Sequence, residues 1–133
     1  MPQATNTLNV TQVGRVCIAV DDMDRALDFY VGTLGFEKVV DVPMGDAGRW
    51  VEVQVSGTPT TIALAPPPPG QKAGGKDTGI ILDTTDVDGD HAALKAAGAD
   101  VDEEITRYGA PVPPMFWLRD PEGNALIVVE PLS

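Results

Sequence analysis

The chain has 133 residues, one cysteine and a net charge of −11, which fits a single domain that can bury a core without a disulfide or a metal. The 20 acidic side chains outnumber the 9 basic ones, and this argues against a nucleic-acid partner because phosphate binding needs patches of lysine and arginine. No apolar run is long enough to cross a membrane and residues 1–10 lack the features of a signal peptide, so we expect a cytoplasmic protein.

The first half of the chain predicts one strand, one helix and three further strands. Residues 1–12 are polar and predict a flexible N-terminal tail before a domain at 13–133. A strand with alternating apolar side chains begins at Arg15, and a helix capped by Asp21 or Asp22 follows it and stops at Gly35. Further strands are predicted near 36–41, 49–55 and 60–65. Together they make a first module at about 13–66.

The second half repeats this pattern. Residues 79–88 repeat residues 15–24 at a spacing of 64 positions, and each run ends in Asp-x-Asp. A helix capped by Asp86 and ended by Gly98 follows, with Val87, His91 and Leu94 on its buried stripe. Strands are predicted near 100–105, 114–119 and 125–130, which gives a second module at about 78–131. A linker at 66–77, stiff in its prolines and flexible in its glycines, joins the modules.

Three motifs in this order resemble a known family. They are Val20-Asp-Asp-Met-Asp-Arg-Ala-Leu-Asp-Phe-Tyr30 with Leu34-Gly-Phe36, then Leu94-Lys-Ala-Ala-Gly98, then Asp120-Pro-Glu-Gly-Asn124. The chain resembles the vicinal-oxygen-chelate (VOC) superfamily of glyoxalases, bleomycin-resistance proteins and extradiol dioxygenases over residues 13–131. The resemblance implies an α+β fold, in which two βαβββ modules form a curled mixed sheet around one cavity, and it implies a homodimer.

The resemblance also implies where the metalloenzymes of the family would place their ligands. In this sequence those positions hold Arg15, Gly79, Ile62 or Ala63, and Ile127, none of which is a metal ligand. We therefore expect no metal and no cofactor, with Glu52, Asp83 and Glu130 as the one alternative donor set. The single histidine, His91, is assigned to helix packing.

Strand alternation predicts which side chains would face the cavity. Arg15 would either pair with Asp83 or Glu52 or anchor a ligand oxygen, and Cys17 would act as a small buried hydrophobe beside it. Tyr108 lies in a Gly- and Pro-rich loop at 106–114 that would either close over the cavity or stay at the surface. The predicted ligand-binding residues are Arg15, Cys17, Trp50, Glu52, Asp83, Tyr108, Met115 and Trp117.

Three functions remain open on the sequence. The first is a metal-independent binding protein that sequesters a small aromatic or cationic organic ligand. The second is a metal-free isomerase, cyclase or lyase, with Asp83 or Glu52 as the base and Arg15 as its partner at a developing oxyanion. The third, a metal-dependent lyase or dioxygenase, has the least support because the ligand positions are lost.

Overall fold

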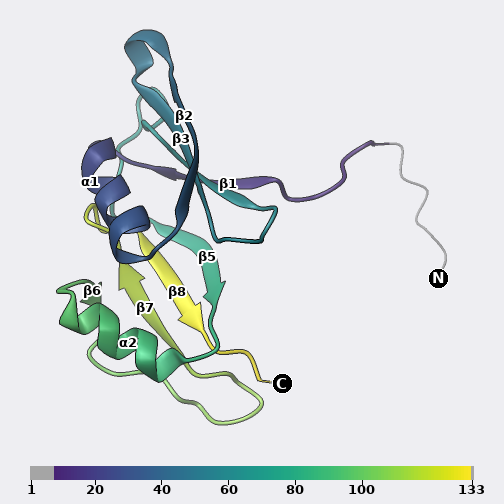
Figure 1. Ribbon diagram of the computed structural model, residues 1–133, viewed down its shortest axis with the longest axis vertical. Coiled ribbons are helices and arrows are strands. Elements are labelled where there is room, and N and C mark those ends of the chain that lie inside the picture. The colour runs from purple at the N-terminus through teal and green to yellow at the C-terminus, as the bar shows by residue number, and fades with distance from the viewer. Residues whose placement is uncertain (1–7, 133) are drawn as a thin grey trace.

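The computed structural model describes residues 8–132 and contains two modules of the same layout (Figure 1). The first seven residues of the tail expected at 1–12 lie outside the described residues. The elements of the first module are β1 (Arg15–Ala19), α1 (Met23–Leu27), β2 (Glu37–Pro43), β3 (Arg49–Gln54) and β4 (Thr61–Ala65). Those of the second are β5 (Asp77–Asp83), α2 (Val87–Ala96), β6 (Asp100–Val101), β7 (Met115–Arg119) and β8 (Ala125–Val129).

Each module forms one four-stranded mixed sheet, and the two sheets have equivalent strand orders. The first sheet runs β1-β4-β3-β2 and the second runs β5-β8-β7-β6. In each, the first strand of the module lies parallel to the last, and the remaining pairs are antiparallel. The α+β fold with two βαβββ modules is thereby confirmed, and β1 and β5 each lie at the edge of a sheet with one strand neighbour within the described chain.

The helices begin and end where the sequence predicts. The Asp22 carboxylate accepts a hydrogen bond from the Arg25 backbone N–H at 3.1 Å, and the Asp86 carboxylate accepts one from Gly89 at 2.9 Å. After α1 the chain continues as a wider π-helical segment, Asp28–Thr33. Gly35 and Gly98 follow the helices with φ of 79° and 78°, which only glycine adopts without strain.

One strand is much shorter than predicted. The strand expected at 100–105 is reduced to the two residues of β6, and one isolated bridge joins Thr106 to Met115 further along. The Asp102 backbone N–H still donates to the Trp117 carbonyl at 3.0 Å, but the Trp117 N–H and Arg119 donate to the Asp102 carboxylate. Among the described residues there is no helix long and apolar enough to span a membrane.

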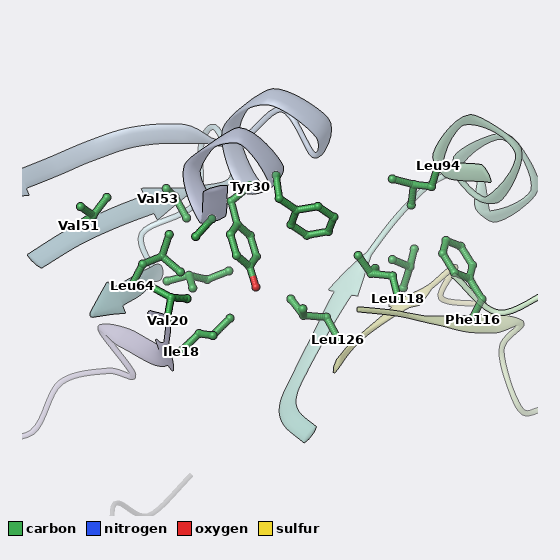
Figure 2. Packing of buried hydrophobic residues seen from close by; sticks show 14 of the residues in the cluster. Ile18, Val20, Tyr30, Val51, Val53, Leu64, Leu94, Phe116, Leu118 and Leu126 are labelled. Carbon is green, nitrogen blue, oxygen red and sulfur yellow. The ribbon is translucent and has the colours of Figure 1, made fainter. Parts of the chain in front are cut away.

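The two modules share a single hydrophobic core on the helix-covered faces of their sheets. Figure 2 shows Tyr30 of the π-helical segment between Val20 of the first module and Leu126 of the second. The Tyr30 hydroxyl donates to the Asp120 carboxylate at 2.8 Å in a buried contact between the modules. Burial first, and then the Asp120 charge, raise the pKa of Tyr30 far above its usual range, so this hydroxyl remains a donor.

Candidate functional site

We call the face of the first sheet that α1 does not cover the open face of this sheet. A buried carboxylate on this face is bonded to several neighbouring side chains. Glu52 of β3 is only 7% exposed. One of its oxygens accepts from the Thr61 hydroxyl at 2.7 Å, and the other accepts from the Trp50 indole N–H at 2.8 Å. Arg15 of β1 reaches across β4 and places its Nε 3.3 Å from Glu52 Oε2. Of the two partners predicted for Arg15, the structure therefore has Glu52.

These contacts keep Glu52 ionised. The Trp50 hydrogen bond lowers the pKa of the Glu52 carboxyl most, followed by the Thr61 hydrogen bond. Burial opposes them by raising this pKa, and the nearby Arg15 lowers it again by smaller amounts. A carboxylate whose oxygens already hold three donors is a weak proton acceptor. Arg15 is different, because its side chain is 58% exposed and its ion pair within residues 8–132 is made through Nε.

Lowering the pH should weaken the fold through Glu52. Because the folded-state pKa is depressed, the stabilisation is complete above the unfolded-state pKa of about 4.3 and is lost as the pH falls through the folded-state value. We expect the unfolding free energy of the natural protein to fall more steeply below about pH 4.3 than that of Glu52→Gln. Urea titrations of both proteins at several pH values measure the difference. Parallel pH profiles would show that the Glu52 contacts contribute nothing.

Cys17 corrects one expectation. It lies on the open face beside Ala63, but it is exposed and not a buried hydrophobe. The physical reason is that β1 is an edge strand, with β4 as its one strand neighbour within the described chain. Partial burial of the thiol still raises its pKa, which disfavours the reactive thiolate.

The second sheet has an open face of its own, with apolar and aromatic side chains in rows. One row across the sheet contains Trp117 of β7, Ile127 of β8 and Ile81 of β5. Met115, Val129 and Asp83 form the next row. This is the facing predicted from the sequence, and the Trp117–Ile127 pairing is the predicted register. Ile81 is 58% exposed, which is unusual for an isoleucine in a strand.

Within one chain, the predicted ligand-binding residues lie in separate groups. Arg15, Cys17, Trp50 and Glu52 share the first open face, and Met115, Trp117 and Asp83 share the second. Tyr108 is 73% exposed in its loop, which places its ring at the surface. Asp83 is the one member of the set that also lines the larger described cavity, a space of about 690 Å³ between the modules.

Sequence reasoning missed two features of this region. The first is Thr61, whose hydroxyl holds Glu52; strand alternation places it on the same face and could have indicated it. The second is the cavity between the modules, lined by Leu34, Val55 and Leu94 among others. A comparison of the two repeats at their turns could have indicated it.

The residues present do not fit the metal site of the metalloenzymes. Ala63 and Ile127 occupy equivalent positions on β4 and β8, beside Cys17 and Ile81, and neither side chain can donate to a metal. The alternative set fails as well: Glu52 is held by Thr61 and Trp50, and Glu130 accepts from the Val87 backbone N–H at 2.9 Å. Between residues 8 and 132, no three donor side chains gather as an ion would require.

A match to a family model assigns the chain to a known superfamily. The profile of the glyoxalase/bleomycin resistance protein/dioxygenase superfamily matches residues 12–128. The chain belongs to this superfamily. The fold and the sequence motifs agree with that assignment.

Several known proteins resemble the chain over nearly its whole length. TnmS3, an antibiotic binding protein from Streptomyces sp. CB03234, is 33% identical with a TM-score of 0.81, over 94% of this chain and 99% of that one. A superfamily member from Sphaerobacter thermophilus DSM 20745 is 36% identical with a TM-score of 0.83, over 92% and 99%. The uncharacterized protein YetH of Bacillus subtilis (strain 168) is 25% identical over 91% of this chain and 99% of its own length.

Proposed function

We propose that the protein is a metal-independent cytoplasmic binding protein that sequesters a small aromatic or cationic organic ligand at its open sheet faces. The proposal rests on the bonding of the Glu52 carboxylate, because both of its oxygens are already bonded to Trp50, Thr61 and Arg15. Such a site offers a flat, partly aromatic surface with a fixed charge pair, and it suits binding better than proton transfer. The likeness to the antibiotic binding protein TnmS3 supports the same reading.

The catalytic alternative, a metal-free isomerase, cyclase or lyase, has less support. A general base must have a free lone pair and a pKa close to the working pH. The lowered pKa of Glu52 moves it away from that condition. Arg15 serves the binding role directly, because within residues 8–132 its outer guanidinium nitrogens have no ion-pair partner and its side chain is 58% exposed to meet a ligand oxygen.

We further propose that the binding unit is a homodimer. The free edges of β1 and β5 and the exposed side chain of Ile81 are features that soluble proteins usually cover. Pairing two copies would cover these edges and bring an open face of one copy against an open face of the other. Trp50 and Trp117 would then stand as walls of a shared site.

The binding proposal is tested with two planar probes of opposite charge, 9-aminoacridine and anthracene-9-carboxylate. We expect each to quench the emission of Trp50 and Trp117, the two tryptophans of the chain. Trp117→Ala should weaken both probes about five- to tenfold, because stacking is lost. Arg15→Ala should weaken the carboxylate probe by about the same factor and leave the acridine unchanged.

The matched control is Arg107→Ala, which removes an exposed arginine paired with Asp88 away from both open faces. It should bind both probes like the natural protein. Light scattering on the same samples should give twice the 14.0 kDa chain mass. Failure of both probes to bind at millimolar concentration, or turnover of either one, would contradict the proposal.

A further inference from the structure

Hydrogen bonds from the turn between β7 and β8 join the two modules at one end. We call the residues that form them, Tyr30, Asp120, Glu122 and Asn124, the polar lock. Asp120 accepts from the Tyr30 hydroxyl at 2.8 Å, and the Asn124 amide donates to the Ala19 carbonyl at 3.3 Å. The Glu122 carboxylate accepts from the backbone N–H of Asp21 at 2.8 Å, just ahead of α1. Each contact joins a residue of the second module to the first.

The repeat predicts an equivalent contact at the other end, between the β3–β4 turn and α2. The strand registers establish the correspondence, since Cys17 pairs with Ala63 as Ile81, 64 positions later, pairs with Ile127. At this spacing Leu94 corresponds to Tyr30, Thr60 to Asn124 and Thr58 to Glu122. Val55, the first residue after β3, corresponds to Asp120, the first after β7.

Every lock residue of the turn is thus replaced by a different side chain, and within the described chain none of the replacements forms a hydrogen bond to the other module. Val55 replaces the buried carboxylate of Asp120, and Leu94 replaces the phenol of Tyr30. Thr58 and Thr60 replace Glu122 and Asn124. Thr58 and Thr60 bond instead within their own module, to the Val55 and Val13 carbonyls. Over residues 8–132, no hydrogen bond joins the 55–60 turn to the stretch 83–94.

A cavity of about 690 Å³ lies where this second lock is missing. Val55, Thr58, Thr60, Asp83 and Leu94, the counterparts of Asp120, Glu122, Asn124, Ala19 and Tyr30, all line it. Its other walls are largely apolar, with contributions from Val16, Leu34, Phe36, Ile62, Leu82 and Val128. The volume lies in the range of sites for small organic molecules.

The charges around the cavity have one sign. Asp83 and Asp90 line it, and no lysine, arginine or histidine is among its lining residues. Within the described chain neither carboxylate forms an ion pair, and Asp90 is held by the Thr84 hydroxyl at 2.5 Å. Apolar walls beside two unpaired carboxylates complement a molecule with an apolar body and a cationic head.

We propose that this cavity between the modules is a second binding site, which meets the second open face at Ile81 and Asp83, for a lipophilic organic amine in its protonated form. The apolar body lies against Leu34, Phe36 and Leu94, and the ammonium group lies at the part of the wall that contains Asp83 and Asp90. The overall charge of −11 raises the local concentration of such a cation.

The test compares two probes of nearly equal shape, 1-naphthylmethylammonium and the neutral 1-naphthylmethanol, by isothermal titration calorimetry of the full chain at low ionic strength. We expect the ammonium to bind at least about fivefold tighter than the alcohol. Asp90→Asn and Asp83→Asn should each reduce this preference, and the double variant should abolish it while the alcohol binds unchanged. A preference that survives in the double variant overturns the proposal.

A bulky substitution in the cavity wall tests whether the probe binds in the cavity. Ala93 is exposed on α2 and lines the cavity, whereas its neighbour Ala92 is exposed and does not line it. Ala93→Trp should therefore weaken both probes by at least about tenfold, and Ala92→Trp is the matched control that should leave them unchanged. Binding retained in Ala93→Trp would place the probe at the open faces and overturn the proposal. So would a changed molecular mass of this variant in light scattering, because a second copy would then be the occupant.

Discussion

Replacing Asp120 with alanine should lower the free energy of unfolding by about 3–5 kcal/mol. The Asp120 carboxylate is 3% exposed and accepts from the Tyr30 hydroxyl, the Asn124 amide and the backbone N–H groups of Glu122 and Asn124. Alanine would leave these buried donors without an acceptor and would loosen the contact between the modules. Urea denaturation followed by circular dichroism measures the change.

The control for this prediction is Tyr30→Phe, which removes one of the four donors and keeps the ring in the core. It should cost about 1–1.5 kcal/mol. The double variant should cost less than the sum of the two single changes, because both remove the same hydrogen bond. A cost below about 1 kcal/mol for Asp120→Ala would mean that the Tyr30–Asp120 contact contributes little to holding the modules together.

Replacing Glu52 with alanine should cost about 2–4 kcal/mol and alter the surroundings of Trp50. The Trp50 indole N–H and the Thr61 hydroxyl would lose their acceptor, and Arg15 would lose its counter-ion. We expect a changed emission maximum for the folded protein together with a lower midpoint of denaturation. Fluorescence-detected urea titration reports both quantities from one experiment.

Glu37→Ala is the matched control, since Glu37 is an exposed glutamate on the neighbouring strand β2. Its cost should stay within about 0.5 kcal/mol. If Glu52→Ala were equally mild, the buried carboxylate could not be the group that fixes the open face, and the binding proposal would lose its main support.

Local signals in the sequence were sufficient for most of the elements. Asp22 and Asp86 cap the helices because a short side chain with an acceptor oxygen can bond the free N–H groups of the first turn. Alternation on β7 and β8, with a five-residue turn between them, determined the Trp117–Ile127 pairing. The strand at 100–105 was overestimated because Asp102 takes a side-chain role that competes with a ladder.

The candidate site was predictable in part. Period-two alternation placed Arg15 and Glu52 on one face, and the cost of an unpaired charge indicated that they would meet. The exposure of Cys17 could not be predicted in the same way, because it depends on whether anything covers the edge strand β1. The alternation of a strand distinguishes its two faces, but it does not say what lies above either of them.

The sequence by itself determined the repeated module, its caps and its registers, because these depend on contacts within or between neighbouring elements. Only the tertiary structure decided how the two modules meet. The Tyr30–Asp120 contact joins residues 90 positions apart, and its counterpart pairs Leu94 with Val55 and leaves a cavity. Such long-range packing depends on the shapes of both modules together, so neither the lock nor the cavity could be read from either repeat alone.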